Sequence, residues 1–352
     1  MELYKIPVLG VLGVVTLVVF PLLHLITFFF LLGLIVYVFL IVFSDGDVML
    51  MFYEWFGSKG DHLKGKVVWI TGGSSGLGEE LAVLMAKKGV KLILTARREK
   101  ELERVKQRCI QQSELKDEDI LIMKMDGVAF DTHLKCVDNA LEYFKKIDIL
   151  VNNSGRSQRS IAVDADLSTT EFILKLNLLG AISITKCVLP HMIANRSGHI
   201  VNMSSVAGKL CAPCSTAYSA SKFGMNGFFD TLRAEVHYHN IVITNVCPGP
   251  VATEIIENAV QKDFDQVPCR NYDGIGERTW KILQTPQRCV ELTLVAISNQ
   301  LSEVWIAKTP MLTQFYLAQY TPTTFRMLSE RLGYLRVEAY LKAQEQANSG
   351  MQ

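Results

Sequence analysis

Three polar residues in the second half of the chain have the types and spacing needed for proton transfer to an oxygen atom. They are Ser205, Tyr218 and Lys222. On a helix, positions i and i+4 share a face, so the tyrosine and lysine side chains can reach a common point. A nearby ammonium favours the phenolate, which lowers the pKa of a tyrosine from its free value of about 10. A serine hydroxyl can both donate and accept a hydrogen bond, so it can hold a substrate oxygen.

A glycine-rich turn far upstream has the context of a dinucleotide-binding loop. Residues 66–71 form an uninterrupted β-branched run typical of a buried strand, and a helical pattern begins at Glu79. Glycines in such a turn let the backbone approach a pyrophosphate, and the helix N-terminus offers it free N–H groups. Together with the polar set, the turn predicts hydride transfer between a nicotinamide dinucleotide and an alcohol or carbonyl. The turn reads Thr71-Gly72-Gly73-Ser74-Ser75-Gly76-Leu77-Gly78.

The end of the next strand, residues 91–96, favours NADP(H). Folds that bind NAD commonly place an acid here, where it holds the ribose 2′-hydroxyl. This chain instead has Ala96 followed by Arg97 and Arg98. A guanidinium pairs with a 2′-phosphate through two hydrogen bonds, whereas a carboxylate would repel it. We therefore expect NADP(H), with Arg97 at the 2′-phosphate. The alternative is that both arginines are solvated residues at a helix entry.

Alternating strands and helices predict the scaffold that positions these residues. This alternation is typical of an α/β, Rossmann-type doubly wound parallel sheet with helices on both faces. Ligands bind beyond the carboxyl ends of such strands, where we expect Gly72, Ser205 and Thr253. Ser168 and Glu171 form a capping-box signature for one long helix. We expect further strands at residues 120–126, 147–152, 198–203, 241–247 and 303–307, and helices at residues 99–112, 133–146, 168–194 and 218–239.

These motifs, in this order, resemble those of the short-chain dehydrogenase/reductase family over roughly residues 64–308. The resemblance implies a catalytic tetrad of Asn177, Ser205, Tyr218 and Lys222, in which the asparagine holds a water of the proton relay. The chain departs from the family pattern around Asp126, the expected adenine contact. The full set of expected coenzyme contacts is Gly72, Ser74, Ser75, Gly76, Leu77, Gly78, Arg97, Asp126, Asn153, Tyr218, Lys222, Pro248, Val251 and Thr253.

The first part of the chain predicts a membrane anchor. Residues 6–43 contain no charged side chain. As one helix they would be about 57 Å long, against a hydrocarbon core of about 30 Å. Pro21 offers a break, so we expect the main span at residues 22–43, with residues 6–20 as a kinked continuation or a short partner helix. The aromatic residues 49–56 suit either the bilayer interface or packing on the catalytic domain.

We therefore divide the chain into four parts. A membrane anchor covers residues 1–43, and a juxtamembrane linker covers residues 44–63. An NADP-binding catalytic domain follows at residues 64–309, and residues 310–352 form a C-terminal extension that covers the substrate mouth or touches the membrane. The flanking charges do not decide which side of the membrane holds the domain.

Composition excludes two other classes of partner. The 36 basic residues nearly balance the 35 acidic ones, so the chain has no nucleic-acid footprint. Its Cys211-x-x-Cys214 pair has no second pair with zinc-ligand spacing, and the expected chemistry needs no metal.

Within the family, several segments resemble a membrane-anchored reductase of the endoplasmic reticulum. The resemblance implies a carbonyl reductase, reversible as an alcohol dehydrogenase, that acts with NADPH on lipophilic substrates such as steroids and retinoids. Two alternatives are NAD(P)-dependent oxidation of lipid hydroxyls and a catalytically silent membrane scaffold, against which the intact tetrad argues. The expected partners are a lipophilic carbonyl or alcohol and the lipid bilayer, with a homodimer also allowed for.

Overall fold

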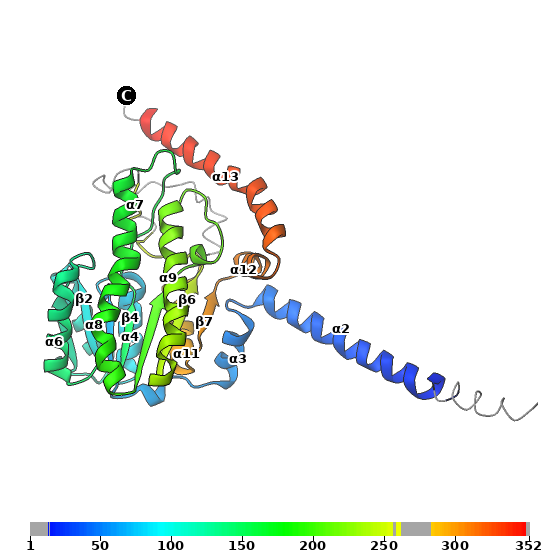
Figure 1. The fold of residues 1–352 in the computed structure, drawn as a ribbon, viewed down its shortest axis with the longest axis horizontal. Coiled ribbons are helices and arrows are strands. Elements are labelled where there is room, and N and C mark those ends of the chain that lie inside the picture. Colours follow the sequence, from blue (N-terminus) through cyan, green and yellow to red (C-terminus); the bar gives the residue numbers. More distant parts are fainter. Residues whose placement is uncertain (1–12, 14, 256–257, 262–282, 350–352) are drawn as a thin grey trace, which may run out of the picture.

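A seven-stranded parallel sheet forms the centre of the protein (Figure 1). The computed structural model describes residues 13, 15–255, 258–261 and 283–349. The strand order is β3-β2-β1-β4-β5-β6-β7, so the order reverses between β1 and β4. This confirms the predicted doubly wound sheet and its switch point, where ligands bind in such folds. The strands are β1 (Val67–Thr71), β2 (Lys91–Ala96), β3 (Ile120–Lys124), β4 (Ile149–Asn152), β5 (Gly198–Met203), β6 (Ile241–Pro248) and β7 (Glu303–Ile306).

Helices cover both faces of the sheet and bury two apolar cores. Successive residues of a strand point to opposite faces, so Val68 and Ile70 join one core while Val67 and Trp69 join the other. On the first face lie α4 (Gly76–Lys87), α5 (Glu99–Gln111) and α11 (Pro286–Ser298). On the second lie α6 (His133–Phe144), α8 (Gly180–Ala194) and α9 (Thr216–Val236).

The expected helix at residues 168–194 differs from the prediction in two ways. It begins at Leu167 as α7 (Leu167–Leu174), and its N-cap residue, Asp166, makes no side-chain capping bond, so the predicted Ser168 capping box is wrong. A π-helical turn, η5 (Lys175–Leu179), then joins α7 to α8. Such a turn carries one extra residue, which the sequence period does not reveal.

The N-terminal helix projects away from the domain (Figure 1). A π-helical turn at Val15–Val19 leads into α2 (Phe20–Phe43). Pro21 falls in the first turn of α2, where proline is tolerated, and the described helix continues past it without a break. Residues 16–39 are long and apolar enough to cross a bilayer, and none of this stretch is buried by the domain. The expected continuation at residues 6–20 lies partly outside the described residues.

The segment after α2 folds onto the domain. It forms α3 (Val48–Phe56), whose Leu50 and Met51 are buried in the first core. After β7 come α12 (Met311–Tyr320), which contacts α2, and the long α13 (Pro322–Ser349). Figure 1 shows α13 running from the α2 junction over the carboxyl edge of the sheet.

Candidate active site

A cavity of about 920 Å³ lies at the carboxyl edge of the sheet. It brings together residues from eight separate stretches of the chain, from the glycine turn to α13. Two of the predicted residues, Gly78 and Asn177, are not part of its lining. The predicted residues that line it are Gly72, Ser74, Ser75, Gly76, Leu77, Arg97, Asp126, Asn153, Ser205, Tyr218, Lys222, Pro248, Val251 and Thr253.

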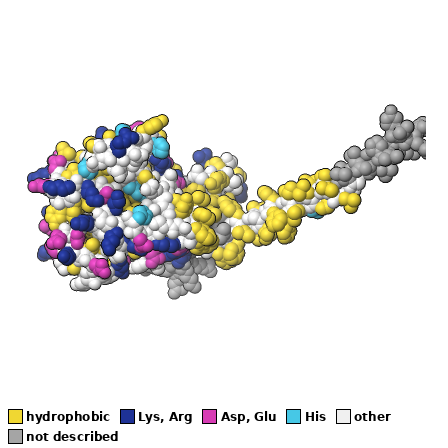
Figure 2. Space-filling model, turned by 90° about the horizontal axis from the view of Figure 1, so that it is seen from below, with side chains coloured by type: hydrophobic (Ala, Val, Ile, Leu, Met, Phe, Trp, Pro, Cys, Tyr) yellow, Lys and Arg dark blue, Asp and Glu magenta, His cyan; other side chains and the backbone are white. Residues whose placement is uncertain are grey.

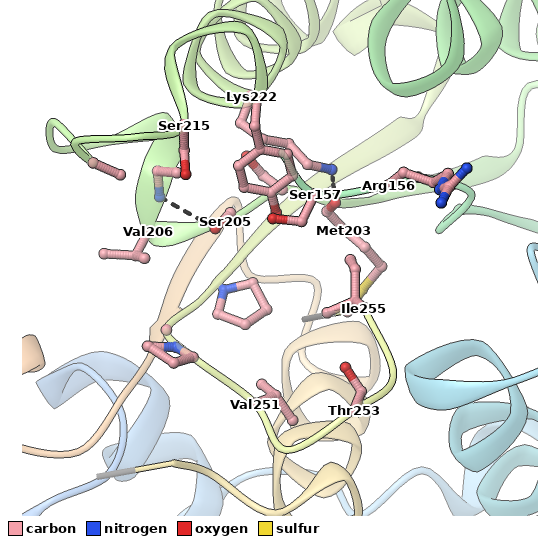
Figure 3. Close-up of a pocket in the computed structure, with 18 of the residues that line it drawn as sticks. Arg156, Ser157, Met203, Ser205, Val206, Ser215, Lys222, Val251, Thr253 and Ile255 are labelled. Atoms are coloured by element: carbon pink, nitrogen blue, oxygen red, sulfur yellow. Dashed lines mark hydrogen bonds between the residues drawn. The ribbon is translucent and has the colours of Figure 1, made fainter. Parts of the chain in front are cut away.

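Ser205, Tyr218 and Lys222 meet where the end of β5 faces α9; Figure 3 labels the serine and the lysine. Ser205 lies two residues beyond the end of β5, where its hydroxyl accepts from the N–H of Ala207 at 3.2 Å and interacts with the phenol of Tyr218. The ammonium nitrogen of Lys222 donates to the carbonyl of Met203 at 2.7 Å and lies 5.8 Å from the centre of the tyrosine ring. One hydroxyl and one ammonium thus lie beside the phenol.

Burial changes the proton affinities of both ionisable groups. Burial raises the pKa of Tyr218, and the hydrogen bond from Ser205 opposes this only in part. Burial also lowers the pKa of Lys222, to about 8. The predicted lowering of the tyrosine pKa is therefore wrong for the protein alone, because burial outweighs the groups that favour the phenolate. The physical reason is that removal from water disfavours both the phenolate and the ammonium.

A residue missed by sequence reasoning positions the start of α9. The side chain of Gln158 is fully buried, and its Oε1 accepts hydrogen bonds from the backbone N–H groups of Ala217, at 2.9 Å, and Tyr218, at 3.4 Å. The first N–H groups of a helix lack partners within the helix, so an outside acceptor fixes where the helix begins. Gln158 therefore sets the position from which the phenol reaches the cavity. No local signal in the sequence points to it.

Asn177 lies in the π-helical turn η5, fully buried behind the cavity wall. Its Oδ1 accepts from the N–H of Arg156, and its Nδ2 donates to the carbonyl of the same residue, each at 2.9 Å. Nδ2 also donates to the hydroxyl of Ser221 at 3.1 Å. These bonds link η5 to the strand-end loop and to α9. π-Helical turns often occur at functional sites, where they redirect a side chain.

Backbone contacts hold the glycine turn in place. Gly72 has a φ of +66°, which favours glycine, and a Cβ there would lie 3.0 Å from the Cα of Ser154. A Cβ on Gly78 would lie 2.4 Å from the carbonyl oxygen of Gly72, so α4 approaches the strand end closely. Asn153 braces the turn, because its Nδ2 donates to the carbonyls of Thr71 and Gly72 at 3.0 and 3.1 Å.

The two arginines after β2 lie differently. Arg97 lines the cavity. The side chain of Arg98 also lines it, and donates to the hydroxyls of Ser74, at 3.3 Å, and Ser75, at 2.9 Å. We expected Arg97 at a 2′-phosphate, and of the two arginines it is Arg98 that the structure holds against the glycine turn. Asp126 lies in the loop after β3, two residues beyond the observed end of that strand.

The far end of the cavity is walled by the two last helices. From α12 come Met311 and Leu317, and from α13 come Phe325, Leu328 and Leu332. Sequence reasoning placed residues 310–340 at the substrate mouth or at the membrane without naming side chains. Their richness in Leu, Phe, Met and Tyr was the available signal.

Comparisons with known proteins give consistent matches. Residues 66–263 match a family model described as short chain dehydrogenase. The chain is 43% identical over 299 residues to dehydrogenase/reductase SDR family member 7 of Homo sapiens, covering 84% of this chain and 86% of that protein. It is 35% identical to a Drosophila melanogaster family protein 7-like relative, covering 75% of this chain and 79% of that protein.

A solved structure shares the fold. An alcohol dehydrogenase from the archaeon Thermococcus sibiricus, complexed with 5-hydroxy-NADP, aligns with a TM-score of 0.59 at 20% sequence identity. The alignment covers 70% of this chain and 97% of that one.

Proposed function

The chain belongs to the short-chain dehydrogenase family, and on that premise we propose that it is a membrane-anchored, NADPH-dependent carbonyl reductase of lipophilic substrates. The observation that carries the proposal is the single cavity that joins the glycine turn to Ser205, Tyr218 and Lys222. The reaction is reversible, so the same site also oxidises alcohols when the oxidised coenzyme is in excess.

The residues around the turn fit a phosphorylated nicotinamide dinucleotide. Gly76 and Thr253 lie close together, because a Cβ added to the glycine would be in van der Waals contact with the threonine Cβ at 3.7 Å. The turn itself lines the cavity at Ser74, Ser75 and Gly76, where the N-terminus of α4 offers N–H groups to a pyrophosphate. Arg97 and Arg98 supply guanidinium groups for a 2′-phosphate, and no carboxylate follows β2 directly. When bound, the coenzyme supplies the hydride.

Ser205, Tyr218 and Lys222 carry out the proton transfer to the substrate oxygen. Tyr218 donates a proton to the substrate oxygen in reduction, and Ser205 orients that oxygen by a hydrogen bond. Burial raises the pKa of the phenol, which keeps it protonated as a donor. The Lys222 ammonium lies 5.8 Å from the centre of the tyrosine ring, where its charge favours the phenolate that forms when the proton leaves. Asn177 ties the loop at Arg156 to α9 and so holds the site together from behind its wall.

The substrate end favours lipophilic carbonyls such as those of steroids and retinoids. Its walls on α12 and α13 carry five large apolar side chains beside the polar Thr313, Gln314, Ser329 and Arg336. The apolar ones are Met311, Leu317, Phe325, Leu328 and Leu332. The apolar helix α2 supports attachment to a membrane, for which we propose the endoplasmic reticulum on the basis of the relatives.

One assay tests the proposal and its alternatives. Full-length protein in detergent or vesicles is given NADPH or NADH with a panel of lipophilic ketones and aldehydes, and coenzyme oxidation is followed at saturating and limiting substrate. We expect turnover with NADPH that exceeds turnover with NADH. Turnover of lipid alcohols with oxidised coenzyme, but no reduction of any carbonyl, would favour the oxidase alternative. Coenzyme binding without turnover in either direction would favour the silent scaffold.

A further inference from the structure

Helix α3 is apolar on both of its sides. Its inner side buries Leu50 and Met51 in the core. Its outer side presents Phe52, Trp55 and Phe56, which are 51%, 60% and 73% exposed, at helical spacing and without a charged side chain among them. Clusters of exposed aromatic residues are uncommon on a soluble domain and mark a contact surface.

Ion pairs fix this outer side relative to α2. Arg288 of α11 pairs with the carboxylates of Asp45, where Nε and Oδ2 are 2.8 Å apart, and Glu54 of α3. Asp47 caps α3 by accepting from the N–H of Leu50 at 3.0 Å, and it also accepts from the N–H of Trp305 in β7 at 2.8 Å. The few residues between α2 and α3 are therefore held by the domain, and the outer side of α3 keeps a set position beside the apolar span.

Helix α12 lies between the span and the cavity. On one side, the ring of Tyr316 lies 6.3 Å from the ring of Tyr37 in α2, and Tyr320 is 70% exposed nearby on the same helix. On the other side, Met311 and Leu317 line the cavity. Figure 2 shows apolar side chains gathered where α2 meets the domain, while charged side chains spread over the remainder of this view.

We propose that this junction face, made by Met49, Phe52, Trp55 and Phe56 of α3 with Tyr320 of α12, lies in the interfacial region of the bilayer. Tryptophan and tyrosine favour that region, because each has an apolar ring and a polar group that stays hydrated. The face is continuous with α2, so a bilayer that holds α2 meets it directly. A second part rests on the proposed function: the cavity behind α12 receives substrate dissolved in the membrane.

Fluorescence quenching tests the face without any activity assay. Full-length protein is placed in phosphatidylcholine vesicles with or without brominated acyl chains near the headgroup, and tryptophan emission is compared. We expect bromolipid to quench the wild type, and Trp55→Phe to reduce that quenching about twofold or more. The matched control is Trp69→Phe, which removes a fully buried indole and leaves the quenching in place. Quenching that is unchanged in Trp55→Phe would overturn the proposal and leave a protein partner as the occupant of this face.

Kinetics in vesicles test the delivery of substrate. The partition coefficient of one lipophilic ketone is varied through the lipid composition of the vesicles, while its free aqueous concentration is held constant and below saturation. We expect the rate to rise in proportion to the mole fraction of ketone in the lipid. A rate that follows the free aqueous concentration alone would overturn the delivery part while the proposed reductase activity stands. Absence of reduction for every carbonyl would instead overturn the proposed function, and the quenching result would still decide the position of the face.

Discussion

The two ends of the cavity differ in what forms their walls, which is mainly backbone at one end and mainly side chains at the other. At the coenzyme end, the glycine turn and the braced Asn153 form the walls, and a Cβ added to Gly72 would lie only 3.0 Å from the Cα of Ser154. At the substrate end, long apolar side chains of α12 and α13 form the walls, and Leu332 is 60% exposed. A backbone wall fixes geometry, whereas a side-chain wall can change shape by rotamer. We infer that the first end sets the reaction and the second sets which substrate enters.

The largest expected effect lies where the two ends meet. Tyr218→Phe removes the proton donor and keeps the ring, so we expect kcat to fall by about 10²–10⁴-fold. Coenzyme affinity, measured by fluorescence titration, serves as the control and should change little. A variant that keeps a tenth of the wild-type rate would show that another group donates the proton.

The second-largest effect is expected at the coenzyme end, from the two arginines that follow β2. Arg98→Ala removes a guanidinium held by Ser74 and Ser75, and we expect NADPH affinity to fall about ten- to a hundredfold while NADH affinity changes little. Arg97→Ala is the matched comparison, since Arg97 lines the cavity without a hydrogen bond to the turn among those described. If each variant loses as much affinity for NADH as for NADPH, neither arginine contacts the 2′-phosphate.

A pH titration sharpens the role of the lysine. With a pKa of about 8, Lys222 loses its proton as pH rises from 7 to 9. If the coenzyme binds only the ammonium form of Lys222, then above pH 8 the lysine must take up a proton before the coenzyme can bind. The affinity for coenzyme therefore falls as pH rises. The expected loss is roughly tenfold between pH 7 and 9 by linkage. Lys222→Arg keeps the charge over this range and should bind without that dependence. A flat wild-type profile would contradict the expectation.

The smallest effect is expected at the substrate end. Leu332→Ala shortens one wall residue that is still partly in water, so KM for a large lipophilic ketone should rise on the order of threefold. Coenzyme affinity and kcat should stay unchanged. Leu341→Ala is the control, because that residue of the same helix is also exposed but does not line the cavity. An effect on coenzyme affinity would mean that the two ends are coupled.

Sequence reasoning reached the sheet and the residues along its carboxyl edge, because apolar periodicity and glycine spacing are local signals. It did not reach features that depend on tertiary contact. The π-helical turn at Asn177 leaves no mark in the hydrophobic period. Gln158 acts on Tyr218 from a distant part of the chain, and only folding brings the two together. The raised pKa of Tyr218 reflects burial, which residue spacing alone does not report.

The pairing of Arg288 with Asp45 and Glu54 also decides where the chain can be shortened. A soluble form that starts at residue 64 would lack both carboxylates and would leave the pockets of Leu50 and Met51 open to water. A form that starts at Ser44 keeps the pair and the apolar packing of α3, and loses α2 with its contacts to α3 and α12. Shortened proteins for crystallisation or assay should therefore begin at Ser44, some twenty residues before the first strand.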